Sequence, residues 1–142
     1  MILYLDTSAL VKVFVSEGGR ELVVRAVKES SKIATSMVSY VEARATFARL
    51  LREEALTEEE HTGVVAALDH RWPSYERPPI TENLIRLAGD LAQRYALRGY
   101  DSIQLASALV CHGRQRDLRF LSFDDDLNEA AKQIVLVYEV SS

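Results

Sequence analysis

The chain begins with an unbroken apolar run, Ile2 to Leu5, which ends at Asp6. A run of this kind, without polar alternation, predicts a strand that is buried on both faces, as in a parallel sheet. Thr7 and Ser8 follow the aspartate and are typical of a helix start. Asp6 is therefore expected where a central strand gives way to a helix, and open α/β sheets bind their ligands at this end of the strands.

Further apolar segments of strand length alternate with helical patterns along the chain. Strands are also predicted at 33–35, 119–123 and 134–138, and helices at 7–15, 20–30, 37–55, 57–72, 81–95, 100–112 and 125–133. The segment 7–15 is apolar enough for either structure, and its hydroxyl residues favour a helix. Strands interleaved with helices predict an α/β fold with helices on both faces of a parallel sheet. A chain of 142 residues is expected to form a single domain, 1–142.

The composition excludes several classes of protein. The chain is 48% apolar and 27% charged, as in an ordinary globular protein. No apolar stretch approaches the ~20 residues of a membrane helix, and no basic segment of a signal peptide precedes the first strand. Cys111 is the only cysteine, so an internal disulfide is excluded and a cytoplasmic location is expected. The net charge of −4 means that any contact with a nucleic acid needs local Arg and Lys side chains or a bound metal ion.

Four acidic residues stand where the predicted fold could bring them together. Asp6 and Asp124 each follow a strand, Asp101 opens a helix, and Glu42 lies inside another helix. Carboxylates that share a cleft repel one another, so they need raised pKa values or a neutralising cation. Mg²⁺ and Mn²⁺ prefer carboxylate and water oxygens. The pattern therefore favours a divalent metal site, with Asp126 as a further candidate ligand.

Such a site would suit hydrolysis of phosphodiester bonds. A bound divalent ion can orient a water, lower its pKa and stabilise the charge that develops on a phosphoryl group. Ser8 and Ser122 are expected to hold metal-bound waters. Candidates for contact with the phosphates of a nucleic-acid substrate follow Glu42 on the same helix, and these are Arg44, Arg49 and Arg52. The alternative for these arginines is pairing with nearby acids such as Glu53 and Glu54.

Each acid also has a simpler interpretation. Asp6, Asp101 and Asp124 could be helix N-caps, and Asp101 with Gln104 has the spacing of a capping box. Glu42 could lie on a solvated helix face. Two other chemistries are alternatives to a metal site. A metal-free acid–base nuclease would use His61, His70 or His112. An aspartyl phosphatase would need a second Asp two residues after the first, where this chain has Ser8.

The acids lie in four segments that resemble the motifs of the PIN-domain ribonucleases, most closely the VapC-type toxins of prokaryotic toxin–antitoxin pairs. The segments are YLDTSALVK (4–12), SYVEARA (39–45), LRGYDSIQLA (97–106) and LSFDDDLNEAA (121–131). The resemblance covers nearly the whole chain, and the four motifs occur in the family's order. Gln104 stands where the family commonly has His, and Ser122 where Thr is common. Neither difference removes a carboxylate.

This resemblance implies a three-layer α/β/α sandwich around a parallel sheet of about five strands. It implies that Asp6, Glu42, Asp101 and Asp124 are the catalytic, metal-binding residues of an endoribonuclease that depends on Mg²⁺ or Mn²⁺. It also implies a homodimer and a cognate antitoxin that occupies the site. The alternative is a PIN-like binding or scaffold protein without catalytic activity.

Overall fold

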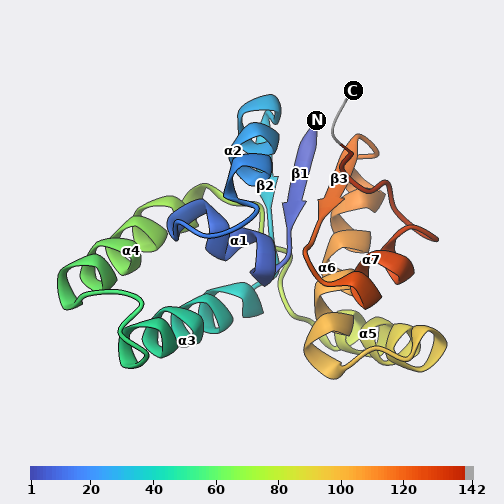
Figure 1. Cartoon of the computed structure of the whole chain (residues 1–142). Helices are drawn as coiled ribbons and strands as arrows, with labels where there is room; N and C mark the ends of the chain where they lie inside the picture. The colour runs from blue at the N-terminus through green and yellow to red at the C-terminus, as the bar shows by residue number, and fades with distance from the viewer. Residues whose placement is uncertain (140–142) are drawn as a thin grey trace.

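A parallel sheet runs through the centre of the computed structural model, which describes residues 1–139. Its strands are β1 (Ile2–Leu5), β2 (Lys32–Ala34) and β3 (Leu118–Leu121), in the order β2-β1-β3. Tyr4 pairs with Ala34 on one side and with Phe120 on the other. Figure 1 shows the three strands side by side, with helices covering the sheet from both sides. The predicted α/β/α sandwich is confirmed.

Each face of the sheet has its own hydrophobic core, because side chains of β1 alternate between the faces. Leu3 and Leu5 pack on one side and Ile2 and Tyr4 on the other, and all four are buried. This explains why the run carries no polar residue. The first face is covered by α1 (Thr7–Phe14), α2 (Arg20–Glu29), α3 (Val38–Arg52), α4 (Glu58–Arg71) and the 3₁₀ turn η1 (Trp72–Ser74). The second is covered by α5 (Glu82–Tyr95), α6 (Gly99–Arg114) and α7 (Asp125–Ala131).

The sheet is narrower than the five strands expected. Residues 1–139 form three strands, and single parallel bridges add Glu76 beside β2 and Val137 beside β3. The predicted strand 134–138 is correct only in its second half. The Leu136 carbonyl accepts from the Phe120 N–H and the Tyr138 N–H donates to the Phe120 carbonyl, whereas the N–H groups of Ile134 and Val135 still donate to the carbonyl of Ala131 at the end of α7. The chain reaches β3 only afterwards.

Helix starts follow the local sequence signals in most cases. Thr57 and Glu60 form the predicted capping box, and the Thr81 hydroxyl caps α5. The segment after Asp6 is a helix rather than a strand. The predicted helix 100–112 instead begins at Gly99, with Arg98 at the N-cap position. The cap interpretation of Asp101 is therefore wrong.

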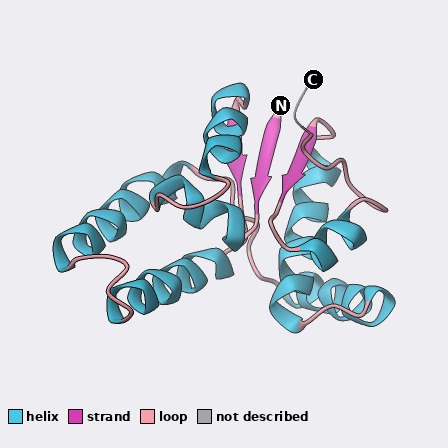
Figure 2. Cartoon of the chain, viewed as in Figure 1, coloured by secondary structure: helices cyan, strands magenta, loops and turns pink. Residues whose placement is uncertain are grey.

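The carboxyl ends of β1 and β3 lie at the same end of the molecule as the first turns of α3 and α6 (Figure 2). The sheet thus gathers the four acidic segments at one end. Within residues 1–139, no helix is long and apolar enough to cross a membrane.

Candidate functional site

Asp6 is the most buried carboxylate of the predicted set, with 4% of its surface exposed. Its Oδ1 accepts hydrogen bonds from the Ser8 hydroxyl at 2.7 Å and from the Ala9 N–H at 3.0 Å. Its Oδ2 accepts one from the Ser122 hydroxyl at 2.6 Å. The bond from Ala9 makes Asp6 the N-cap of α1. Capping therefore accounts for one oxygen and fixes the orientation of the other.

Glu42 reaches the same region from α3. Its Oε1 accepts a hydrogen bond from the Thr7 hydroxyl at 2.6 Å and from the Gln104 amide at 3.1 Å. Thr7 directly follows Asp6 at the start of α1, and Gln104 lies on α6, one turn after Asp101. Glu42 is thus held between α1 and α6, and it does not point to a solvated face away from the other acids.

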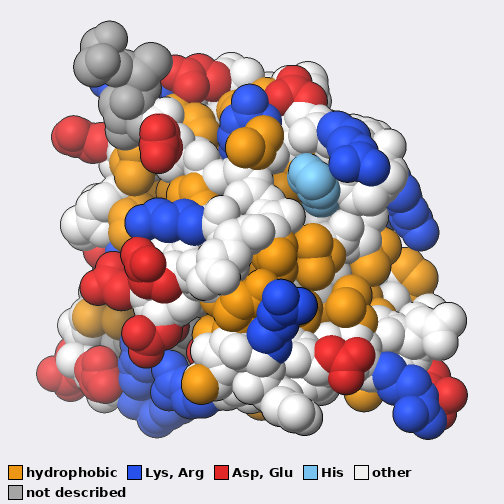
Figure 3. Space-filling view, turned by 90° about the vertical axis from the view of Figure 1, so that its right-hand side faces the viewer, with side chains coloured by type: hydrophobic (Ala, Val, Ile, Leu, Met, Phe, Trp, Pro, Cys, Tyr) orange, Lys and Arg blue, Asp and Glu red, His pale blue; other side chains and the backbone are white. Residues whose placement is uncertain are grey.

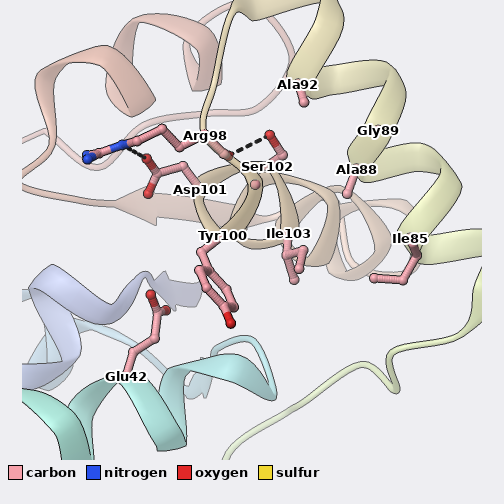
Figure 4. A pocket seen from close by; sticks show the side chains of 11 residues that line it. Glu42, Ile85, Ala88, Gly89, Ala92, Arg98, Tyr100, Asp101, Ser102 and Ile103 are labelled. Carbon is pink, nitrogen blue, oxygen red and sulfur yellow. Dashed lines mark hydrogen bonds and ion pairs between the residues drawn. The ribbon is translucent and has the colours of Figure 1, made fainter.

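Asp101 and Asp124 share one arginine. The Arg98 Nε lies 3.5 Å from the Asp101 Oδ2, and the Arg98 Nη2 lies 4.0 Å from the Asp124 Oδ2. Figure 4 shows the first of these pairs. The other oxygen of Asp124 caps α7 by accepting from the Leu127 N–H at 3.0 Å. Arg98 thus links the carboxylate of α6 to the carboxylate at the start of α7.

The pKa values of Asp6 and Asp101 are raised by burial and by the neighbouring carboxylates. Burial raises the pKa of Asp6 to about 6, hydrogen bonds from Ser122, Ser8 and Ala9 oppose the shift, and the charge of Asp124 adds to it. Burial also raises the pKa of Asp101, and the nearby charges of Asp124 and Glu42 raise it further, against the effect of Arg98. The four carboxylates therefore repel one another when all are ionised.

The donor chemistry of the acids fits a hard divalent cation. Carboxylate oxygens are the preferred ligands of Mg²⁺ and Mn²⁺, and a dication would relieve the repulsion between them. In the described part of the chain, however, no three Asp, Glu, His or Cys side chains already form a group that could hold a metal ion. The carboxylates are held apart by their hydroxyl, amide and guanidinium partners. An ion would have to draw them together.

A groove opens beside Glu42 and Asp101, with a cavity volume of about 810 Å³. Figure 4 shows Tyr100 between these two acids, and 61% of its surface is exposed. The groove continues between α5 and α6 over an apolar floor, which is formed by Ile85, Ala88, Ala92 and Ile103. One groove therefore offers charged oxygens at one end and an aromatic and aliphatic surface along the rest.

The predicted hydroxyl groups lie at the site, and the further acid lies outside this hydrogen-bond network. Ser8 and Ser122 both donate to Asp6, and their hydroxyl oxygens lie 3.5 Å apart. They also organise the backbone, because the Ser8 hydroxyl accepts from the Phe123 N–H and the Ser122 hydroxyl from the Asp124 N–H. Asp126 is exposed on the first turn of α7.

The three arginines of α3 do not line the groove. The Arg44 guanidinium donates to the Tyr40 hydroxyl at 2.8 Å, and this places it on a different side of α3 from Glu42. Arg49 pairs with Glu53 at 3.9 Å, as the alternative interpretation expected, and Arg52 is exposed. A role of these residues in RNA binding stays a prediction.

Sequence reasoning missed three residues that organise the acids: Thr7, Arg98 and Gln104. In the sequence, Thr7 indicates only a helix start, and Gln104 only part of a capping box or a mild departure from a family motif. A long amide side chain in an otherwise apolar helical segment could have been recognised, because buried polar groups need hydrogen-bond partners.

The other candidate nucleophiles and bases lie away from the acids. His61 and His70 are on α4, and His112 is in the last turn of α6, about 16 Å along the helix from Asp101. Burial raises the pKa of the Cys111 thiol to about 11, so it stays protonated and unreactive.

Comparison with known proteins gives a consistent set of relatives. The PIN domain family model matches residues 3–133. Ribonuclease VapC45 and Ribonuclease VapC49, from two Mycobacterium tuberculosis strains, are each 33% identical over 109 residues, which is 77% of this chain and 76% of the relative.

Solved structures agree in fold. FitAcB from Neisseria gonorrhoeae superposes with a TM-score of 0.67 at 18% identity, over 98% of this chain and 97% of that one. A toxin–antitoxin complex from Klebsiella pneumoniae gives a TM-score of 0.67 at 17% identity, over 97% and 99%. Mycobacterium tuberculosis VapC20, a toxin that cleaves the sarcin–ricin loop, gives 0.63 at 16% identity, over 90% and 94%.

Proposed function

Because this chain belongs to the PIN domain family, and to its VapC-type group, we propose that it is an endoribonuclease that depends on Mg²⁺ or Mn²⁺. The observation that carries the proposal is the gathering of Asp6, Glu42, Asp101 and Asp124 at one end of the sheet. These residues come from four separate segments, and nothing in helix capping requires them to meet. The substrate would be RNA, cleaved by hydrolysis of a phosphodiester bond.

In this proposal the four carboxylates would hold the ion, which, when bound, would activate a water and stabilise the charge on the phosphoryl group. The surrounding residues prepare the carboxylates for this role. Ser8 and Ser122 fix both oxygens of Asp6. Arg98 is 87% exposed at the rim of the groove, where it can contact an RNA phosphate once it leaves the acids.

We further propose that the protein is the toxin of a toxin–antitoxin pair, that it forms a homodimer in the cytoplasm, and that a cognate antitoxin covers the groove. The apolar floor of the groove, where Ile85 is 44% exposed, offers surface for such contacts. Figure 3 shows hydrophobic side chains gathered on the side of the molecule that lies to the right in Figure 1, with charged side chains around them.

The purified protein is expected to cleave single-stranded RNA with Mg²⁺ or Mn²⁺ and to be inactive in EDTA. If the ion binds only the folded state, it should also stabilise that state, by about 2.7 kcal/mol at a concentration of a hundred times Kd. Calorimetry and thermal unfolding measure the binding, and a gel assay measures cleavage. If calorimetry shows no divalent-ion binding, the scaffold alternative replaces this proposal.

Replacing Arg98 with glutamine is expected to tighten divalent-ion binding by up to about fivefold. The guanidinium is a competing cation beside Asp101 and Asp124, but it is mostly exposed, and exposed pairs are worth only about 0–1 kcal/mol. Isothermal titration at low salt measures the change. Arg86→Gln is the matched control, since Arg86 is an exposed arginine paired with Glu82 on α5. Weaker ion binding by the Arg98 variant would contradict the idea that the guanidinium competes with the divalent ion for the two carboxylates.

A further inference from the structure

Gln104 is a buried amide that connects the core of the protein to one of the acids. It lies on α6 with 2% of its surface exposed. Its Oε1 accepts a hydrogen bond from the Tyr4 hydroxyl at 2.8 Å. Its Nε2 lies 3.0 Å from the Thr7 hydroxyl, 3.0 Å from the Ser39 hydroxyl and 3.1 Å from the Glu42 Oε1. Every partner comes from a different element than α6.

The orientation of this amide follows from the chemistry of its neighbours. An ionised carboxylate can only accept hydrogen bonds, so the nitrogen of Gln104 must face Glu42. The carbonyl oxygen then faces Tyr4, whose hydroxyl must donate. Burial raises the pKa of Tyr4 well above its ordinary value, which keeps that donor protonated. Tyr4 is itself fixed, because its ring stacks on Phe120 with centroids 5.5 Å apart.

Thr7 completes the arrangement at Glu42. Its single hydroxyl proton points to the Glu42 Oε1, at 2.6 Å, and its oxygen accepts from Gln104. Both donors to Glu42 therefore act on the same oxygen. Within residues 1–139, Oε2 receives no hydrogen bond, which leaves it as the oxygen free to bind a ligand.

We propose that Gln104 is a positioning residue, which together with Thr7 fixes the side chain of Glu42 and determines which carboxylate oxygen is offered to the divalent ion. This inference rests on the proposed function. A free glutamate loses rotamer freedom when it binds a metal ion, whereas here the loss has already occurred on folding. Outer partners of this kind orient the ligands of metal sites and affect their affinity.

Replacing Gln104 with methionine tests the role, because methionine has nearly the same shape and no N–H donor. Affinity for Mn²⁺, measured by isothermal titration, is expected to fall about tenfold or more. Gln133→Met is the matched control, since Gln133 is exposed beyond the end of α7, and its affinity should equal that of the wild type. Unchanged affinity in Gln104→Met, while the wild type binds Mn²⁺, would overturn the positioning role and leave the proposed function intact. A wild type that binds no divalent ion would instead remove both.

A double-mutant cycle separates positioning from a general structural role. If Gln104 acts through Glu42, then Gln104→Met should have no further effect on Mn²⁺ affinity in a Glu42→Gln background. An equal loss in both backgrounds would mean that Gln104 only supports the fold, and would overturn the inference.

Thr7 provides an independent test should Gln104→Met not fold, or should binding in the Glu42→Gln background be too weak to measure. Thr7→Val removes the hydroxyl with little change of shape, and it is expected to weaken Mn²⁺ binding several-fold. Thr7→Ser keeps the donor and should bind as the wild type does. Equal Mn²⁺ affinity of Thr7→Val and Thr7→Ser would overturn the proposed role of the Thr7 hydroxyl in fixing Glu42.

Discussion

The Asp6→Asn variant is expected to cleave RNA at least about a hundredfold more slowly than the wild type at saturating Mg²⁺. Residues that merely orient metal ligands already contribute 10–100-fold in such sites, and Asp6 is proposed to be a ligand itself. The carboxylate is also the most buried of the four, so a water molecule cannot easily take the place of its oxygen as a ligand.

The asparagine should preserve the fold around position 6. Its side-chain oxygen can still accept from the Ala9 N–H, and asparagine is as good an N-cap as aspartate. The amide nitrogen would meet the Ser122 oxygen, which can accept once its hydroxyl turns. A loss of cleavage in a variant with the wild-type circular dichroism spectrum would therefore result from the missing charge.

Two further variants make this result specific. Asp90→Asn removes an exposed carboxylate on α5 and should cleave at the wild-type rate. Asp126→Asn tests whether the exposed acid on α7 also binds the ion. If it does, the cleavage rate of this variant should fall by a comparable factor. Wild-type activity of Asp6→Asn would contradict the proposed function.

The position of Asp6 was predictable because two local features agree. An unbroken apolar run of four residues can be buried only between two layers, and the hydroxyl residues after it favour a helix start. The carboxyl ends of parallel strands meet at one edge, so Asp124, which follows β3, had to lie near Asp6. That much of the site follows from local sequence and sheet geometry.

The rest of the site depends on contacts between distant segments. Glu42 lies inside a helix, and its spacing alone could not show which way it faces; the resemblance to a family motif supplied that expectation. The bonds that hold it join residues that are 35 and 62 positions apart in the chain. Gln104 has a plausible local partner in Asp101, so the sequence gives no reason to expect its hydrogen bonds to distant segments.

The strand predicted at 134–138 forms only in part, with Val137 bridged to Phe120 of β3, for a related reason. Its composition is that of a buried strand, and Val135 and Tyr138 are indeed buried. The end of α7, however, continues to occupy the backbone N–H groups of Ile134 and Val135. Apolar composition predicts burial, whereas strand pairing depends on which backbone groups the preceding helix leaves free.

Without divalent ions, the wild-type protein is expected to lose stability as the pH rises from 3.8 to about 6. Burial raises the pKa of Asp6 from 3.8 to about 6, so the folded state favours the protonated form. Below about pH 3.8 Asp6 is protonated in both the folded and the unfolded state, and its raised pKa then does not affect the free energy of unfolding. Above pH 6 it is ionised in both, and the folded state bears the full cost of a buried charge. A difference of about two pKa units corresponds to about 3 kcal/mol.

The comparison with Asp6→Asn isolates this effect from other titrations. The asparagine has no charge to bury, so its free energy of unfolding in EDTA should exceed that of the wild type at pH 8 and approach it at pH 4. Urea unfolding at both pH values measures the difference, and parallel pH profiles for the two proteins would contradict it.

At a concentration of about a thousand times Kd, Mg²⁺ should reverse the order of stability at pH 8, because binding then adds about 4 kcal/mol to the wild type. The ion would stabilise the wild type, by neutralising Asp6 together with the other acids, and would do much less for Asp6→Asn. The variant would then be the more stable protein in EDTA and the inactive one in Mg²⁺. That combination is expected of a residue that binds the ion, because an asparagine would cap α1 equally well without the larger cost of a buried charge.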